Sequence, residues 1–220
     1  TLRLAHMANR IADGEPWQYV VSREQFGGRD FYVDKDVLIP RPETELVVEQ
    51  ATKLIHNGDK VLDLCCGSGI VGVTIASDRK VNVTFADVSK KAIRIAKFNA
   101  KNNKIKGKFV VSNMFAAVKG KYNAIVCNPP YIETATINTL DSSVKDYEPH
   151  LALDGGADGL DFYRTLAAEA HKHLLPNGVL VMEIGYNQGA TVPPLFADKY
   201  DVTLIKDYSH NDRIVVCKLK

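Results

Sequence analysis

The stretch VLDLCCGSGI at residues 61–70 decides the fold of this 220-residue chain. Its first four residues are apolar except for Asp63, a pattern typical of a strand buried on both faces of a sheet. Gly67 and Gly69 then allow a tight turn, because glycine adopts left-handed backbone torsions at little cost. The apolar residues from Ile70 onward favour a helix. The stretch therefore predicts strand, glycine-rich turn and helix, the first unit of a parallel α/β sheet.

Strand and helix patterns alternate along most of the chain. Short apolar runs predict strands at residues 60–64, 81–86, 108–111, 122–127 and 178–184, and amphipathic segments predict helices at 70–77, 90–102 and 160–175. Residues 193–199 suggest one more short helix. The last two apolar runs, at 202–205 and 213–219, lack a clear helix between them and are expected to pair antiparallel. We therefore predict an α/β fold with a doubly wound, mainly parallel seven-stranded sheet and an antiparallel C-terminal strand.

The first sixty residues precede this alternation. Residues 1–13 read as a short helix. Aromatic and β-branched residues in the segment 17–38 surround Gly27-Gly28, which predicts an N-terminal β-hairpin. Pro42 and the acidic residues after it open a helix that runs to about His56.

Composition excludes several classes of protein. Apolar residues make up 45% and charged residues 25%, which is ordinary for a globular protein and unlike a disordered chain, a collagen or a coiled coil. No apolar run approaches the roughly 18 residues of a membrane-spanning helix, and the first thirty residues lack the apolar core of a signal peptide. We therefore expect a cytoplasmic protein with no membrane partner.

Charge and cysteine content are equally ordinary. The 28 Lys and Arg residues nearly balance the 26 Asp and Glu residues, so net charge alone does not indicate a nucleic-acid partner. Cys65, Cys66, Cys127 and Cys217 match neither a zinc-binding spacing nor a disulfide framework. We expect reduced thiols and no metal site.

The glycine-rich turn predicts the first half of a ligand site. Residues 67–72 fit the pattern G-x-G-x-x-G, and Asp87 ends the next strand, eighteen positions after Gly69. A carboxylate there is placed to accept hydrogen bonds from both hydroxyls of a ribose, which indicates an adenosine-containing ligand. Both NAD and S-adenosylmethionine satisfy these features. S-adenosylmethionine carries a cationic end that favours a nearby carboxylate, which Asp63 is placed to supply.

The sequence Asn128-Pro129-Pro130-Tyr131 predicts the second half of the site. The prolines have no N–H and a fixed φ, so the backbone is stiff and its carbonyls stay free. The Asn128 side-chain oxygen and the Pro129 carbonyl can each accept one hydrogen of a planar NH2 group, while Tyr131 packs on its face. Such positioning directs the nitrogen lone pair at an electrophile and is worth roughly 7–11 kcal/mol in well-oriented intramolecular reactions. Since ligands of such sheets bind where the strand order reverses, we expect the two halves to face each other across one crevice.

Together, residues 63–69, Asp87 and residues 128–131 resemble class I S-adenosylmethionine-dependent methyltransferases that act on planar NH2 groups. The sequence LIPRPETE at residues 38–45 and the segment 147–160 more specifically resemble the release factor glutamine methyltransferases, the HemK/PrmC family. The resemblance implies a Rossmann-like fold, S-adenosyl-L-methionine as cofactor and S-adenosyl-L-homocysteine as product. It also implies methylation of the side-chain amide nitrogen, N5, of the glutamine in the Gly-Gly-Gln motif of peptide chain release factors.

The resemblance also gives residues their expected roles. The residues that would bind the cofactor are Asp63, Cys65, Cys66, Gly67, Ser68, Gly69, Asp87, Asn113, Met114 and Asn128. Those that would be catalytic and hold the glutamine amide are Asn128, Pro129, Pro130 and Tyr131. The walls of the substrate site would be formed by Arg41 and Thr44. Two positions depart from the family pattern. Cys65 stands where the family usually has Gly, and the segment 112–115 lacks the Asp often found there, although Asn113 can still bond to adenine and Met114 can pack on it.

The family also carries an N-terminal helical domain that helps to hold the release factor. Here only residues 1–13 or so match a remnant of it. We expect residues 1–40 to form this remnant and the hairpin linker, and residues 41–220 to form the catalytic domain.

Three other interpretations compete with this one. A nucleic-acid methyltransferase acting on an amino group of adenine or guanine would use the same Asn-Pro-Pro-Tyr cradle after base flipping, and eight basic residues among the nineteen at 90–108 could follow a phosphate backbone. A solvated helix face explains that run more simply, so we expect no stable nucleic-acid binding. An NAD-dependent oxidoreductase would need a catalytic group near the nicotinamide, and His171 and His173 are not obviously placed for it. A non-catalytic cofactor-binding module would not need residues 128–131.

Overall fold

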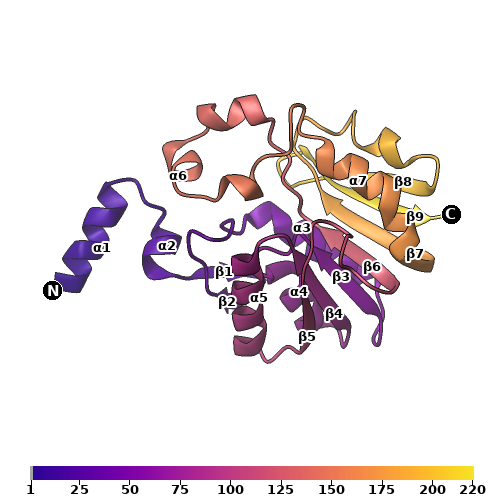
Figure 1. Cartoon of the computed structure of the whole chain (residues 1–220), viewed down its shortest axis with the longest axis horizontal. Coiled ribbons are helices and arrows are strands. Elements are labelled where there is room, and N and C mark those ends of the chain that lie inside the picture. Colours follow the sequence, from indigo (N-terminus) through magenta and orange to yellow (C-terminus); the bar gives the residue numbers. More distant parts are fainter. Residues whose placement is uncertain (1) are drawn as a thin grey trace.

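A seven-stranded sheet forms the centre of the molecule, which a computed structural model describes over residues 2–220; Thr1 of the predicted first helix lies outside the described residues. The strands are β3 (Lys60–Leu64), β4 (Asn82–Asp87), β5 (Gly107–Val111), β6 (Tyr122–Cys127), β7 (Leu174–Glu183), β8 (Tyr200–Lys206) and β9 (Asp212–Leu219). Their order is β5-β4-β3-β6-β7-β9-β8 (Figure 1). Strands β3 to β7 are parallel, and β9 runs antiparallel between β7 and β8. The predicted mainly parallel sheet with an antiparallel C-terminal strand is confirmed.

The strand order reverses between β3 and β6. From β3 the chain builds outward to β4 and β5, and from β6 it builds outward to β7 on the other side. The two central strands pair in parallel from Val61↔Ala124 to Leu64↔Cys127, so they end at the same level. In open parallel sheets, ligands bind outside the carboxyl ends of the strands at this reversal point.

Helices cover both faces of the sheet. On one face lie α3 (Glu45–Leu54), α4 (Ile70–Asp78) and α5 (Lys90–Asn102); on the other lie α7 (Asp161–Glu169) and the 3-10 helices η4 (Ala170–His173) and η5 (Pro193–Phe196). Successive strand residues alternate between the two layers. In β7, Val179 and Val181 pack on the first layer, while Leu180 and Met182 pack on the second. The doubly wound architecture is therefore confirmed.

The N-terminal region differs in part from expectation. The predicted hairpin forms from β1 (Glu24–Phe26) and β2 (Arg29–Phe31), and its turn residues Gly27 and Gly28 have φ of +53° and +71°, as a tight two-residue turn requires. The residues before it form a helix, α2 (Trp17–Val21), where the β-branched composition favoured a strand. Tertiary contact overrides that propensity, because the buried hydroxyl of Tyr19 donates to the carbonyl of Val37 at 2.5 Å.

Trp17 lies at the start of α2, and its side chain is 52% exposed. Helix α1 (Leu2–Ala12) precedes α2 and projects away from the sheet (Figure 1).

The boundaries of two predicted helices also differ from prediction in an informative way. The helix expected at residues 160–175 ends at His173, and β7 begins at Leu174, which pairs with Tyr122. Pro176 explains the early end, because proline disfavours helical backbone in the residue before it. The helix expected from Pro42 begins as a 3-10 turn, η1 (Pro42–Thr44), which leads into α3.

A long segment between β6 and α7 crosses the carboxyl edge of the sheet. It contains η2 (Thr134–Thr139), α6 (Ser142–Lys145) and η3 (His150–Ala152), and it lies above the central strands in Figure 1. A parallel bridge between Ile132 and Asp154 joins the beginning of the segment to its end. Within residues 2–220, no helix has the length and apolar character needed to cross a membrane.

A buried asparagine joins the hairpin to the glycine-rich turn. Asn99 of α5 is fully buried, and its side-chain nitrogen donates to the carbonyls of Tyr32 and Ser68, both at 2.9 Å. Its side-chain oxygen accepts the backbone N–H of Tyr32 at 2.8 Å. One amide group therefore fixes the end of β2 against the loop that follows β3.

We expect Gly72→Ala to destabilise the fold, although alanine normally favours a helix interior by about 0.5–1 kcal/mol over glycine. A Cβ at Gly72 would lie 2.6 Å from the Phe85 ring and 2.8 Å from Asp63 Oδ2, and both side chains are buried. Overpacking of this kind costs about 1–3 kcal/mol, so the net free energy of unfolding should fall by about 1–2 kcal/mol. Urea denaturation measures this change. The exposed Ser77→Ala on the same helix is the control, and an unchanged stability for Gly72→Ala would contradict the packing argument.

Candidate active site

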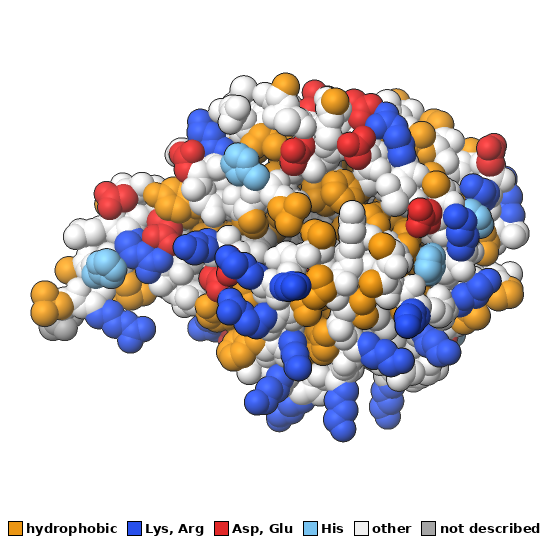
Figure 2. All heavy atoms as spheres, viewed as in Figure 1, with side chains coloured by type: hydrophobic (Ala, Val, Ile, Leu, Met, Phe, Trp, Pro, Cys, Tyr) orange, Lys and Arg blue, Asp and Glu red, His pale blue; other side chains and the backbone are white. Residues whose placement is uncertain are grey.

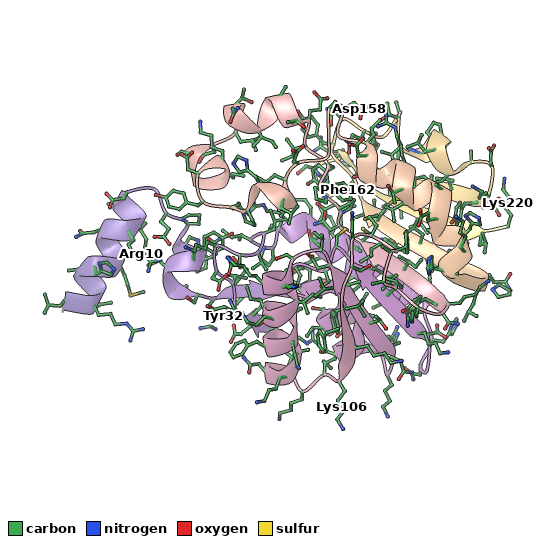
Figure 3. The ribbon with its side chains drawn as sticks, in the orientation of Figure 1. Arg10, Tyr32, Lys106, Asp158, Phe162 and Lys220 are labelled. Atoms are coloured by element: carbon green, nitrogen blue, oxygen red, sulfur yellow. The ribbon has the colours of Figure 1, made fainter. Side chains whose placement is uncertain are left out.

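A cavity opens where β3, β4, β5 and β6 end. Its walls come from the loops after these strands, from residues 36–44, from residues 149–152 and from Phe162 of α7. Phe162 lies near the middle of the molecule in Figure 3, and hydrophobic side chains gather across the same zone of the surface in Figure 2. Predicted site residues that line the cavity are Thr44, Asp63, Cys65, Cys66, Gly67, Ser68, Asp87, Asn113, Met114, Asn128 and Pro130. The two halves predicted from the sequence thus meet at one cavity.

The remaining predicted residues lie behind the wall of the cavity. Gly69 packs against α5, because a Cβ there would lie 2.9 Å from the Cβ of Ala96. Arg41 forms an ion pair with Glu148. Tyr131 turns its hydroxyl away to a buried carboxylate, described below, and Pro129 contributes its backbone.

The loop after β3 brings backbone close to the cavity. Gly67 has a φ of +51°, and a Cβ at this position would meet no atom within 4 Å, so the loop is open on that side. Cys65 has a φ of +56°, a left-handed conformation that costs a residue with a Cβ about 1–2 kcal/mol. This is the position where the resembled family usually has Gly. The Cys65 thiol packs 3.8 Å from the Met114 sulfur, across the cavity wall.

Asp87 ends β4 and holds the glycine-rich loop in place. Its Oδ2 accepts the N–H of Gly67 at 2.9 Å and its Oδ1 accepts the N–H of Ser89 at 2.8 Å. Burial raises the pKa of Asp87, and these backbone hydrogen bonds act in the opposite direction. Because each carboxylate oxygen can accept two hydrogen bonds, both retain capacity for a pair of hydroxyl groups.

Asp63 is a buried carboxyl group at the cavity wall. Its Oδ2 accepts the N–H of Gly72 at 2.8 Å. Burial raises its pKa to about 8, with a further upward contribution from the charge of Asp87 and a downward one from the Gly72 N–H. A cation in the cavity would stabilise the ionised form, so Asp63 fits a cationic ligand group.

Two hydrogen-bond acceptors after β6 have no partner. The Asn128 side-chain nitrogen donates to the Thr44 hydroxyl at 3.2 Å. The Asn128 side-chain oxygen and the Pro129 carbonyl receive no hydrogen bond from any group within residues 2–220. Together they can accept both hydrogens of one NH2 group.

A second buried carboxyl group lies behind Asn128. Glu183 ends β7 and is 1% exposed; its Oε2 accepts the Thr44 hydroxyl at 2.7 Å and its Oε1 accepts the Tyr131 hydroxyl at 3.1 Å. Burial raises the pKa of Glu183, while these two hydrogen bonds and the positive charge of Arg213 oppose the rise. From the sequence, Glu183 was assigned no role.

A third buried carboxyl group, Glu148, was missed. Its Oε2 accepts the N–H of Ile39 at 3.0 Å and its Oε1 pairs with the guanidinium of Arg41. These contacts join the segment before α3 to the segment that crosses the carboxyl edge, and both segments line the cavity. The only signal in the sequence was the family resemblance of residues 147–149.

A glycine-rich segment supports the backbone of Tyr131. A Cβ at Gly155 would lie 2.7 Å from Tyr131 Cα, and one at Gly159 would lie 2.4 Å from the Tyr131 carbonyl oxygen. The side-chain nitrogen of Gln188 donates to the carbonyls of Tyr131 and Gly159 at 3.2 and 3.1 Å. Glycine is needed at these two positions because a side chain would collide with backbone.

The basic run at residues 90–108 leads away from the cavity. Lys91 and Arg94, near the start of α5, pair with Asp36 at 2.8 and 3.6 Å. The helix then runs for 13 residues, about 20 Å, away from the carboxyl edge. Lys106 lies at the bottom edge of Figure 3, where Lys and Arg side chains gather in Figure 2, far from Phe162. This placement favours a solvated face over a track that leads nucleic acid to the site.

A methyltransferase family model and several methyltransferases match this chain. Residues 42–201 match the family model "Methyltransferase small domain". A release factor glutamine methyltransferase from Clostridium acetobutylicum is 39% identical over 91% of this chain and 74% of its own length. One from Agrobacterium fabrum is 35% identical over 97% of this chain and 78% of its own length.

Solved structures share the fold at low identity. A methyltransferase from Pyrococcus furiosus superimposes with a TM-score of 0.68 over 98% of both chains at 17% identity. The 16S rRNA N2 G1207 methyltransferase of T. thermophilus, solved with AdoMet and guanosine, superimposes with a TM-score of 0.65 over 90% of this chain and 50% of that one, also at 17% identity. The resemblance drawn from the sequence motifs is confirmed by the closer relatives, and the chain belongs to the release factor glutamine methyltransferase family.

Proposed function

We propose that this chain transfers a methyl group from S-adenosyl-L-methionine to the side-chain amide nitrogen of the glutamine in the Gly-Gly-Gln motif of a peptide chain release factor. The observation that carries the proposal is a pair of neighbouring acceptors without a donor among residues 2–220: Oδ1 of Asn128, a residue that lines the cavity, and the carbonyl of Pro129 next to it in the chain. A primary amide NH2 offers two hydrogens and matches this pair. The relatives at 35–40% identity are named for glutamine methylation of release factors.

The cavity residues fit S-adenosyl-L-methionine. Asp87 offers carboxylate capacity to a ribose, the buried Asp63 suits a cationic amino acid end, and Asn113 and Met114 suit an adenine. The open side of Gly67 allows close approach of the ligand to backbone. When bound, S-adenosyl-L-methionine supplies an electrophilic methyl group on a cationic sulfur and leaves as S-adenosyl-L-homocysteine. The structural neighbour solved with AdoMet supports this assignment.

The residues after β6 prepare the glutamine nitrogen for attack. Hydrogen bonds from its two N–H groups to Asn128 and Pro129 oppose delocalisation of the lone pair into the amide and direct that pair into the cavity. Positive charge that develops on the glutamine nitrogen during methyl transfer would be stabilised by both acceptors. One proton then leaves the nitrogen for water, which gives the neutral methylamide.

No strong base is required in this scheme. Burial raises the pKa of Tyr131, so its phenol stays protonated at neutral pH and does not take up the proton. The Tyr131 ring instead supports the site from the side away from the cavity, and its hydroxyl donates to Glu183. Because release factors act in translation, we place the enzyme in the cytoplasm.

The first test is transfer of radiolabelled methyl from S-adenosyl-L-methionine to three acceptors: intact release factor, its Gln→Ala variant in the Gly-Gly-Gln motif, and ribosomal RNA. We expect label on the intact factor alone. Label on RNA alone would overturn the proposal in favour of a nucleic-acid amino-methyltransferase. Label on the Gln→Ala variant would show that another residue is modified.

We expect Asn128→Ala to impair turnover far more than cofactor affinity, because it removes an acceptor for the target NH2. A loss of about 100-fold in kcat is consistent with removal of one preorganised transition-state partner, while the Kd of S-adenosyl-L-methionine should change by about threefold or less. The exposed Asn102→Ala on α5 serves as control. Turnover near that of the unmodified chain in Asn128→Ala would contradict the cradle mechanism.

Cofactor binding at pH 7 should release a proton from Asp63. Its pKa of about 8 leaves the carboxyl group mostly protonated before binding, and a cation beside it favours the ionised form. Calorimetry in buffers of different ionisation enthalpy measures the number of protons released, which should approach one and fall sharply in Asp63→Asn. Equal proton release by both proteins would remove Asp63 from the cationic end of the cofactor.

A further inference from the structure

A network of four side chains lies directly behind the free acceptor of Asn128. Glu183 accepts the Thr44 hydroxyl at 2.7 Å and the Tyr131 hydroxyl at 3.1 Å, and Thr44 accepts the side-chain nitrogen of Asn128 at 3.2 Å. We call these four residues the amide-orienting network. It joins the turn before α3, the loop after β6 and the end of β7.

The direction of each hydrogen bond follows from the chemistry of the partners. The Thr44 hydroxyl has one proton, which it donates to Glu183 Oε2. The Thr44 oxygen is left with lone pairs and pairs only with a donor, which in Asn128 is the side-chain nitrogen. The Asn128 oxygen therefore lies on the other side of the amide, where no group within residues 2–220 donates to it.

This orientation decides whether the site can hold its substrate. The two ends of an asparagine amide are alike in shape and opposite in hydrogen bonding. Turned by half a rotation, Asn128 would present N–H groups to the NH2 of glutamine, so two donors would meet. The target nitrogen would then keep one acceptor, the Pro129 carbonyl, and its lone pair would be poorly fixed.

We propose that Glu183 is a positioning residue for methyl transfer, which acts through Thr44 to hold the Asn128 oxygen toward the glutamine nitrogen. This inference rests on the proposed function, since it assumes an NH2 group as the acceptor. Glu183 does not line the cavity, whereas Thr44 and Asn128 do. Its second hydrogen bond fixes Tyr131, so one carboxylate orders both ends of the Asn128–Tyr131 loop.

A role in packing alone does not explain a carboxylate at this position. Glu183 is 1% exposed, and an apolar side chain would fill such a space without the cost of desolvating a charge. Thr44 is similarly buried at 2% exposure. Thr44 bonds to Asn128 and Glu183 bonds to Tyr131. The hydrogen bonds of this pair therefore lead to both ends of the loop after β6, which is the arrangement expected of a support for that loop.

Substitution of Thr44 tests the network with little change of shape. Thr44→Val removes the hydroxyl, and Thr44→Ser keeps it. Thr74→Val is the matched control, because Thr74 is also 2% exposed and its hydroxyl has no hydrogen-bond partner among the described residues. For each variant we would measure kcat, the KM for release factor, the Kd of S-adenosyl-L-methionine and the midpoint of thermal unfolding.

We expect Thr44→Val to lower kcat about tenfold or more, with a cofactor Kd close to that of Thr74→Val. Its unfolding midpoint should fall below that of Thr74→Val, because the buried Glu183 carboxylate loses a hydrogen bond. Thr44→Ser should recover most of the lost turnover. In the Asn128→Ala background, Thr44→Val should have an effect of about twofold or less, since no amide remains to be oriented. Turnover of Thr44→Val equal to that of Thr74→Val, no recovery in Thr44→Ser, or the full loss in the Asn128→Ala background would each overturn the proposal.

A measurement without substrate separates this inference from the proposed function. The side-chain NH2 signals of Asn128 are assigned by NMR from their loss in Asn128→Ala. We expect their hydrogen exchange to be about tenfold faster in Thr44→Val and in Glu183→Ala than in the unmodified chain, because a protecting acceptor or its support is gone. Unchanged exchange would overturn the proposal even in an active enzyme. Absence of methyl transfer to release factor by the unmodified chain would instead refute the proposed function.

Discussion

The parallel pairing of β3 with β6 is the constraint on which the site depends. Its register places Leu64 opposite Cys127, so the glycine-rich loop and the Asn-Pro-Pro-Tyr loop leave the sheet at the same level and side by side. Each loop carries half of the proposed chemistry, one for a nucleoside and a cation, the other for a planar NH2 group. A shift of the register by one residue would turn every side chain of one strand to the opposite face and separate the two halves.

Buried polar groups then fix what the strands bring together. Asp63, Glu148 and Glu183 are each nearly inaccessible to solvent. Asp63 accepts a hydrogen bond from the backbone of α4, Glu148 accepts hydrogen bonds from the segment before α3, and Glu183 joins that segment to the loop after β6. A buried carboxylate that lost its partners would be strongly destabilising. The loops are therefore held in specific positions by groups that tolerate few alternatives. Pro129 and Pro130 restrict the backbone of the loop after β6 in addition, because proline has a fixed φ.

Local sequence patterns were sufficient for the centre of the fold. The limits of β3 and β6 were predicted to the residue, because a buried parallel strand bounded by turn residues is a strong local signal. Helix α2 was mistaken for part of a hairpin, since its β-branched residues are held in a helix by contacts with residues 16 and 37. The early end of the helix before β7 reflects Pro176 and a pairing partner in β6.

Some parts of the candidate site could be predicted from local sequence patterns, and others could not. The glycine-rich loop, Asp87 and residues 128–131 stand in continuous motifs that sequence reasoning can detect. The supporting pairs Arg41–Glu148 and Thr44–Glu183 are 107 and 139 positions apart, so no local pattern connects them. Only folding brings them together, and the strength of each contact depends on burial that the sequence does not specify.

The Asn99 side chain has a consequence for how the molecule opens. Its hydrogen bonds to Tyr32 and Ser68 share one buried amide, so detachment of either the hairpin end or the glycine-rich loop leaves part of that amide without a partner. The two segments therefore behave as one cooperative unit of local unfolding. A ligand that binds only the closed form of the glycine-rich loop therefore also shifts the local unfolding equilibrium of the hairpin toward the folded form. Binding should slow hydrogen exchange of the hairpin amides, although the hairpin does not contact the ligand.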